Sequence, residues 1–141
     1  MARIKVLLDL NVLLDVLQKR EPFYPDSSRV LSLVEEGTIE GFISAHSVTT
    51  LMYLLTKDKS SELAKVVLTS LLQFLKVVKV DQSTIEQALN LPSPDYEDAV
   101  QMTAALQSRL DYLVTRNQRH FPHPAVPVLL PAELLKITPA R

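Results

Sequence analysis

The sequence contains no cysteine and no tryptophan, and only two of its 141 residues are glycine. Without cysteine the chain forms no disulfide and carries no thiolate chemistry, which fits the reducing conditions of the cytoplasm. Lys, Asp or Glu interrupts every hydrophobic run, so none is long enough to span a bilayer. The formal net charge is −1, and a chain this close to neutral has no overall attraction to nucleic acid. Any binding of nucleic acid must therefore depend on a local patch.

The composition is typical of a globular protein. Hydrophobic residues make up 47% of the chain and charged residues 22%, and these proportions favour a folded core over disorder. A chain of 141 residues is long enough to bury such a core and short enough to form one domain. Because no repeat, linker or low-complexity tract divides the sequence, we predict a single domain over residues 1–141.

Apolar, β-branched runs alternate along the chain with amphipathic segments, which predicts alternating strands and helices. Strands are expected at residues 3–8, 39–45, 76–80, 111–115 and 126–130, and helices at residues 11–20, 27–37, 47–57, 60–75, 83–89, 95–110 and 131–137. Ser83 and Glu86 have capping-box spacing, and Pro127 places the last strand at an edge. The alternation predicts an α/β fold, a three-layer α/β/α sandwich with a mainly parallel sheet of roughly five strands.

Two acidic residues stand where a parallel sheet binds its ligands. Such ligands bind beyond the carboxyl ends of the strands, and Asp9 directly follows the first strand. An ionised carboxylate in apolar surroundings is costly unless it is paired, hydrogen-bonded or bound to a cation. Asp98 stands in the first turn of the helix over residues 95–110. If it converges on Asp9, the pair forms an oxygen-rich site for a hard divalent cation, which would polarise a phosphodiester bond and activate water.

These acids also have a purely structural interpretation. Asp95 and Asp98 are three residues apart, so Asp95 could cap the helix and Asp98 could complete a capping-box-like turn. For Asp95 we favour the cap. For Asp9 we favour the metal role, because perturbed acids at strand ends tend to be functional. Asp15, one turn beyond Asn11, either borders the crevice or pairs with a basic residue.

Four short segments occur in this order along the chain: LLDLNVLLDVL, FISAHSVTTLMYLL, DYEDAVQMTAA and DYLVTRNQRHF. Together they resemble the motifs of the PIN domain, the nuclease fold of the VapC-type toxins of toxin–antitoxin pairs. The first looks like the family's opening Asp-x-Asn motif, and the second is similar to its second strand and following helix. The third and fourth resemble the Asp-x-Glu-Asp-Ala helix and the Thr-Arg-Asn strand end of one bacterial subgroup. The resemblance spans almost the whole chain.

This resemblance implies an endoribonuclease that depends on Mg²⁺ or Mn²⁺ and hydrolyses the phosphodiester bonds of RNA. Asp9 and Asp98 would hold the metal, and Asn11 would orient Asp9. Asp95 would be a further acid of the catalytic group.

The resemblance places other residues around the substrate. Thr115 and Asn117 would line the far wall of the site and form hydrogen bonds to water or phosphate, with Asn117 in the catalytic group. Arg116 and Arg119 would contact the RNA backbone. The alternative for both arginines is plain solvated charge, because phosphate contacts from Arg are common but unspecific.

Several positions depart from the family pattern. Many members place Glu in the helix after the second strand, where this chain has Thr50 or its neighbour Thr49, and many place Asp where it has Asn117. With fewer charged ligands, we predict weak cation binding by the free chain and firmer binding when RNA phosphate supplies charge. His120 stands where the subgroup often has Asp. Imidazole binds Mn²⁺ or Zn²⁺ better than Mg²⁺. A lone His after a strand is, however, more typical of a surface residue than of a metal ligand. The same interpretation applies to His46 and His123.

Two functions remain open from the sequence. The first is a metal-dependent endoribonuclease that acts as a toxin and is restrained by a cognate antitoxin. The second is a catalytically weakened or inactive PIN-like module that binds RNA or a protein partner. Loss of two acids favours the second, and retention of Asp9, Asp98 and Asn117 favours the first. The resemblance also implies a homodimer, and we expect a cytoplasmic protein with no membrane partner.

Overall fold

The computed structural model describes residues 2–122 and 124–139, so His123 lies outside it. Within these residues five strands form one sheet in the order β3-β2-β1-β4-β5, and each neighbouring pair is parallel. The strands are β1 (Lys5–Leu8), β2 (Glu40–Ser44), β3 (Leu75–Val78), β4 (Tyr112–Val114) and β5 (Val128–Leu129). The predicted parallel sheet is confirmed, with β5 at an edge as the proline beside it indicated.

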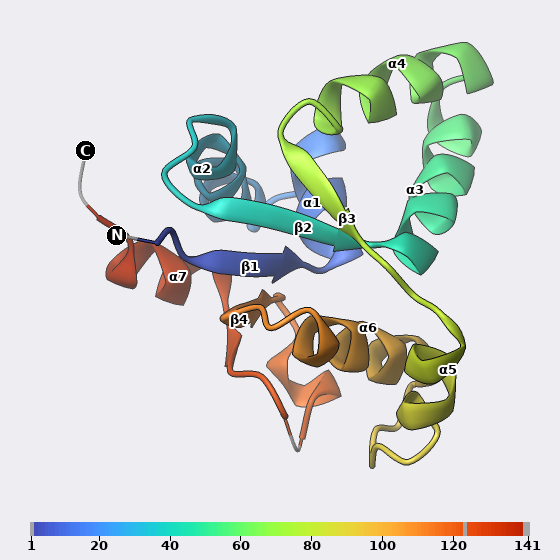
Figure 1. The fold of residues 1–141 in the computed structure, drawn as a ribbon. Coiled ribbons are helices and arrows are strands. Elements are labelled where there is room, and N and C mark those ends of the chain that lie inside the picture. Colours follow the sequence, from blue (N-terminus) through green and yellow to red (C-terminus); the bar gives the residue numbers. More distant parts are fainter. Residues whose placement is uncertain (1, 123, 140–141) are drawn as a thin grey trace.

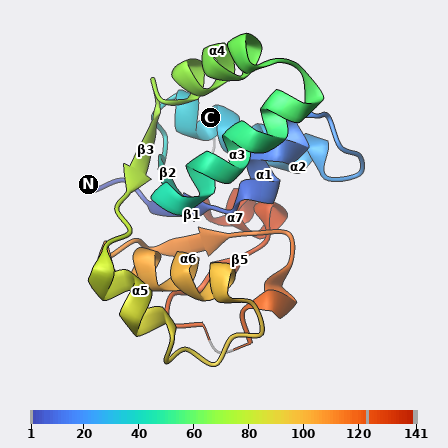
Figure 2. The same ribbon diagram turned by 90° about the vertical axis from the view of Figure 1, so that its right-hand side faces the viewer.

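Helices cover both faces of the sheet. They are α1 (Leu10–Leu17), α2 (Tyr24–Glu35), α3 (Ala45–Asp58), α4 (Ser61–Leu71), α5 (Gln82–Ala88), α6 (Tyr96–Gln107) and α7 (Pro131–Ile137), with a short 3₁₀ helix η1 at Gln118–His120. Figures 1 and 2 show α1, α2, α3 and α4 on one side of the sheet and α5 and α6 on the other. The predicted three-layer α/β/α sandwich is therefore confirmed. None of the helices within the described residues is long and apolar enough to cross a membrane.

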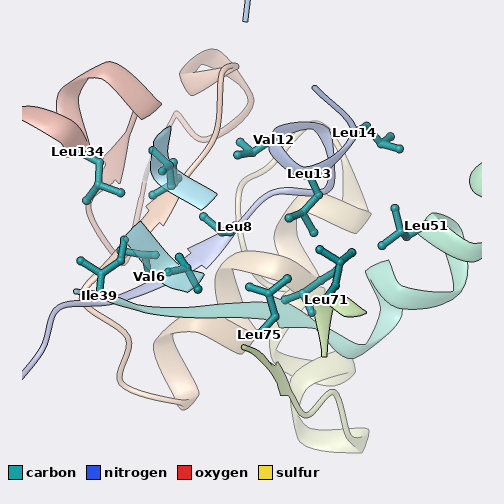
Figure 3. Packing of buried hydrophobic residues seen from close by; sticks show 14 of the residues in the cluster. Val6, Leu8, Val12, Leu13, Leu14, Ile39, Leu51, Leu71, Leu75 and Leu134 are labelled. Carbon is teal, nitrogen blue, oxygen red and sulfur yellow. The ribbon is translucent and has the colours of Figure 1, made fainter. Parts of the chain in front are cut away.

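The central strand β1 is buried on both faces. Successive side chains of a strand point to opposite sides of the sheet, and the buried residues follow this alternation. Val6 and Leu8 belong to the larger hydrophobic cluster, which joins the sheet to α1, α2 and α3 and is drawn in Figure 3. Leu7 packs instead with Met102 of α6 and Leu113 of β4. The buried end of β1, which leads into Asp9, therefore lies between two layers of helices.

The capping box predicted for α5 is wrong. The helix begins at Gln82, one residue before the predicted start, because Asp81 rather than Ser83 is its N-cap. Asp81 Oδ1 accepts from the backbone N–H of Thr84 at 3.1 Å, and Thr84 Oγ1 accepts from the backbone N–H of Asp81 at 3.2 Å. This pair satisfies the first turn of the helix and leaves Glu86 without a capping role.

Candidate metal site at the carboxyl edge of the sheet

Asp9 stands where β1 ends and α1 begins. Its backbone N–H donates to the carbonyl oxygen of Val114 at 2.9 Å, so β4 fixes its position. Asp9 is the N-cap residue of α1, but its side chain accepts no capping hydrogen bond. Its carboxylate instead accepts a hydrogen bond from Thr115 Oγ1, which lies 2.8 Å from Oδ2. The side chain of Asp9 therefore does not cap α1, although its backbone occupies the N-cap position.

The hydroxyl of Thr115 is the contact that orients Asp9. Thr115 is completely buried at the end of β4, and its Oγ1 also accepts from the backbone N–H of Asn117 at 3.1 Å. The sequence assigned the orienting role to Asn11. In the structure Asn11 Oδ1 accepts from Arg20 Nη1 at 3.5 Å, and no hydrogen bond joins Asn11 to Asp9 within the described residues. The adjacent strand holds Asp9 because parallel strands β1 and β4 end side by side.

Asp95 is the N-cap of α6. Its Oδ1 accepts from the backbone N–H groups of Glu97 and Asp98 at 2.8 and 3.3 Å, which is the role favoured for it above. Asp95 also lines the cleft described next, so its negative charge acts on the site even though its carboxylate is already engaged.

Asp98 is held in the first turn of α6. The pKa of its carboxyl is raised from 3.8 to about 6. Burial is the largest cause, the negative charges of Asp95 and Asp9 add to it, and His120 lowers it by a smaller amount. The charge of Asp9, from a distant part of the chain, therefore acts on Asp98. A cation between them would favour their charged forms.

These residues surround a cleft of about 160 Å³. Five of the residues singled out in the sequence line it, namely Asp9, Asn11, Thr50, Asp95 and Asp98. Of the two threonines considered in the second motif, Thr50 is therefore the one at the site.

The cleft also contains residues that the sequence analysis did not assign to it. His46, Gln101 and His120 line it, although both histidines were expected to be surface residues. Gln101 is three residues after Asp98 and therefore lies on the same side of α6, which is the signal that could have identified it. The signal for His46 is its position just after β2, because the carboxyl ends of the parallel strands lie at this edge of the sheet.

Three buried acceptor atoms in this lining have no hydrogen-bond partner: Asp98 Oδ2, Gln101 Oε1 and His46 Nδ1. His46 Nε2 lies 3.3 Å from the carbonyl oxygen of Glu97. Because a carbonyl can only accept, Nε2 carries the hydrogen and Nδ1 carries a lone pair. Unpaired buried acceptors are costly, and a divalent cation is the ligand that would satisfy them. The donor set therefore fits a metal ion.

The fit is not that of a preformed cluster of charged ligands. Across residues 2–122 and 124–139, no three His, Asp or Glu side chains are grouped closely enough to hold a metal ion by themselves. An ion bound between Asp9 and Asp98 would need further oxygen atoms from an amide such as that of Gln101, from water or from substrate.

Arg116 points away from the cleft. Its Nη1 lies 3.4 Å from Asp15 Oδ1, and its guanidinium lies over the ring of Phe23 with its carbon 4.1 Å from the ring centroid. Asp15 is fully buried, and its Oδ2 accepts a hydrogen bond from Ser27 Oγ at 3.5 Å. Of the two alternatives for Asp15, pairing with a basic residue is confirmed. The partner is Arg116, which the resemblance had assigned to RNA and whose side chain is only 20% exposed.

The two other residues expected at the substrate lie at the rim. Arg119 is exposed on η1, and the partly buried Asn117 is the N-cap residue of η1 without a side-chain capping bond. Neither lines the cleft. Their side chains can reach only a ligand that extends beyond the cleft, as a polymer would.

Comparison with known proteins identifies the fold. Residues 5–119 match the family model described as the PIN domain. The chain belongs to the PIN domain family. The match contains the strand ends and the helix α6 that build the cleft, so the family inferred from the four motifs is confirmed. No curated protein matches the chain in sequence.

Solved PIN-like structures share the architecture at low sequence identity. FitAcB from Neisseria gonorrhoeae has a TM-score of 0.69 and 20% identity, with 90% of this chain and 98% of that chain covered. DNA-bound VapBC from Salmonella typhimurium has a TM-score of 0.66 and 21% identity, covering 91% and 98%. VapC20 from Mycobacterium tuberculosis, described as a Sarcin-Ricin loop cleaving toxin, has a TM-score of 0.60 and 14% identity, covering 77% and 86%. At these identities the likeness is one of fold.

Proposed function

We propose that this PIN domain is a divalent-metal-dependent endoribonuclease that hydrolyses RNA phosphodiester bonds. The observation that carries the proposal is the meeting of Asp9 and Asp98 at one cleft, where burial and the charge of Asp9 contribute to the raised pKa of Asp98. Acids whose pKa values are perturbed in a cleft are typical of functional sites. VapC20, which shares the fold, is described as a Sarcin-Ricin loop cleaving toxin, and this agrees with a cleavage activity.

Asp9 and Asp98 would hold the ion, which we expect to be Mg²⁺ or Mn²⁺. A divalent cation at such a site polarises the phosphodiester and activates water for in-line attack. Thr115 keeps Asp9 oriented by donating to Oδ2. Asp95 fixes the start of α6, and thereby Asp98, through its bonds to the first backbone N–H groups. Asp98 must be ionised to bind a cation, and the pKa of its carboxyl is raised to about 6. Protons should therefore compete with the cation increasingly as the pH falls below about 6.

The substrate would complete the site. Thr50 lines the cleft as a neutral residue, and Asn117 lies at the rim, so neither adds a charged ligand. We therefore expect weak binding of the ion by the free protein and firmer binding when an RNA phosphate adds its charge. Arg119, exposed on η1, is the arginine available to the RNA backbone, whereas Arg116 is engaged with Asp15.

We further propose that the chain is the toxin of a toxin–antitoxin pair and that its protein partner is a cognate antitoxin. Structures with this fold include a complex described as toxin–antitoxin from Klebsiella pneumoniae, with a TM-score of 0.66 and 20% identity over 89% of this chain and 97% of that chain. The chain exposes apolar side chains on α3 and α4, among them Tyr53, Leu63, Val66 and Leu72, which a protein partner could cover. A homodimer is a separate expectation, and light scattering on the purified chain tests it.

A second function is a PIN-like module that binds RNA or protein without cleaving it. The observation in its favour is that, among the described residues, no three His, Asp or Glu side chains lie close enough together to hold a metal ion. If this alternative is correct, RNA binds but stays intact in the presence of Mn²⁺.

RNA cleavage with Mn²⁺ by the natural chain and by Asp98→Asn tests the proposal. The variant keeps the shape of the side chain and removes its charge, so cleavage should fall to background. Asp58→Asn is the matched control, because Asp58 is exposed at the far end of α3. Cleavage that persists unchanged in Asp98→Asn would belong to a contaminant or to another site.

A further inference from the structure

One histidine lies directly beside the candidate metal site. His120 Nδ1, on η1, is 3.3 Å from Asp98 Oδ2, and both residues line the cleft with Asp9. Within the described residues no hydrogen bond ends on Asp98 Oδ2, so the nitrogen and the oxygen lie close together without the alignment that a hydrogen bond requires. The side chain of His120 is 54% exposed, which leaves the imidazole free to adjust to a ligand.

The separation of these two atoms is that of neighbouring ligands on one metal ion. Imidazole nitrogen and carboxylate oxygen lie about 2.0–2.2 Å from a bound Zn²⁺, so at octahedral or tetrahedral angles the two ligand atoms are roughly 2.8–3.6 Å apart. The 3.3 Å between His120 Nδ1 and Asp98 Oδ2 falls within this range. A cation could therefore be bound by both atoms with little movement of either residue.

A second observation points to a ligand at the same place. Gln101 lines the cleft and is only 3% exposed, yet its Oε1 has no hydrogen-bond partner. A buried amide oxygen without a donor is costly unless something in the cleft satisfies it. The oxygen atoms of Asp98 and Gln101, one helical turn apart on α6, thus face a cleft that also contains an imidazole nitrogen.

We propose that His120 is a metal ligand and that its nitrogen makes the site prefer Zn²⁺, and to a lesser degree Mn²⁺, over Mg²⁺. Imidazole suits later transition ions, whereas Mg²⁺ takes oxygen ligands almost exclusively. This inference rests on the proposed metal-dependent function and narrows the class of ion that the site takes. It differs from the surface role that the sequence indicated for His120.

Calorimetric titration of the full chain, after treatment with a chelator, tests the inference without relying on activity. The affinities for Mg²⁺, Mn²⁺ and Zn²⁺ are measured for the natural chain, His120→Ala and His120→Asp. Loss of an outer-shell partner already costs about tenfold in metal affinity, so His120→Ala should lower the Zn²⁺-to-Mg²⁺ and Mn²⁺-to-Mg²⁺ affinity ratios at least about tenfold. His120→Asp, which replaces nitrogen with oxygen, should raise the affinity for Mg²⁺. Asp58→Asn, an exposed substitution at the end of α3 and outside the cleft, should leave all three affinities unchanged.

The outcomes separate this inference from the proposed function. If the natural chain binds the ions but His120→Ala leaves both ratios unchanged, the inference is overturned and the metal-dependent function stands. If the natural chain binds none of the three ions, with or without a non-cleavable RNA, both are overturned. If the natural chain has Zn²⁺-to-Mg²⁺ and Mn²⁺-to-Mg²⁺ affinity ratios near one, the site has no preference among these ions, and the inference is overturned without any variant.

Discussion

Thr115 donates its hydroxyl hydrogen to Asp9 Oδ2 across 2.8 Å, although the two residues are 106 positions apart in the chain. The bond joins the ends of two adjacent parallel strands, and the same hydroxyl accepts from the backbone N–H of Asn117. One buried side chain therefore orients the first acid of the site and shapes the turn that follows β4. This arrangement makes Thr115 a positioning residue rather than a ligand.

Removing this hydroxyl should weaken both the fold and the site. Thr115→Val keeps the shape of the side chain but leaves Asp9 and the Asn117 N–H without a partner. A hydrogen bond to a charged group contributes about 1.5–3 kcal/mol, so urea unfolding should show a loss of that order. Mn²⁺ affinity should fall as well. Thr115→Ser, which retains the hydroxyl, should restore most of the metal affinity, and equal metal affinities in the Val and Ser variants would show that the hydroxyl does not orient Asp9.

Arg116 should prove important for stability and not for RNA binding. Arg116→Ala leaves the fully buried Asp15 without its ion-pair partner, and breaking a buried pair in this way typically costs about 3–5 kcal/mol. Because burial raises the pKa of Asp15, protonation can relieve part of this penalty, so we expect a loss near the lower end. Arg119→Ala, an exposed substitution, should change the free energy of unfolding by less than about 0.5 kcal/mol.

The measurements that separate these roles are urea unfolding and RNA affinity on the same two variants. Arg119→Ala should weaken RNA binding at unchanged stability. An Arg116→Ala protein with unchanged stability and reduced RNA affinity would instead support the RNA contact predicted from the sequence.

Asp95 can be tested as a cap and as a catalytic acid in one series. Asp95→Ala removes the acceptor for the N–H groups of Glu97 and Asp98 and should cost about 1 kcal/mol in the free energy of unfolding. Asp95→Ser restores a capping oxygen without the charge. If cleavage of RNA returns with Ser, the residue acts through the helix. If stability returns and cleavage does not, its carboxylate takes part in the reaction or in metal binding.

Asp98 should make the metal-free protein less stable as the pH rises. The ordinary pKa of this carboxyl, which applies to the unfolded chain, is 3.8, and its pKa in the folded chain is about 6. The folded state therefore keeps this proton to a higher pH than the unfolded state does. The resulting stabilisation is complete below about pH 4 and is lost as the pH rises through about 6. At 1.36 kcal/mol per pKa unit, the loss is up to about 3 kcal/mol.

Unfolding measured between pH 4 and pH 7 in the presence of a chelator checks this dependence. Asp98→Asn has no proton to lose, so the slope contributed by this residue should disappear, whereas Asp58→Asn should retain it. A natural chain and an Asp98→Asn chain with the same pH dependence would contradict the buried, repelled carboxylate described here.

Much of the architecture was predictable because it follows from local pattern. The apolar run from Val6 to Leu8 is the pattern of a strand buried on both faces, and these residues do alternate between the two clusters. The predicted strands and helices all formed, most of them with shifted ends. The start of α5 was wrong because Asp81 competes with Ser83 for the cap. Both residues are good caps, and only the helix that formed shows which of them was used.

The sequence by itself determined the parallel sheet, the two layers of helices and the position of Asp9 at a strand end, because periodicity and the rules of strand connection depend on neighbouring residues. Only the tertiary structure decided which side chains meet: Thr115 holds Asp9, Arg116 turns to Asp15, and His120 lies against Asp98. Such pairings depend on the order and register of strands and on where each helix begins, and those are set by the packing of the whole core rather than by any short segment.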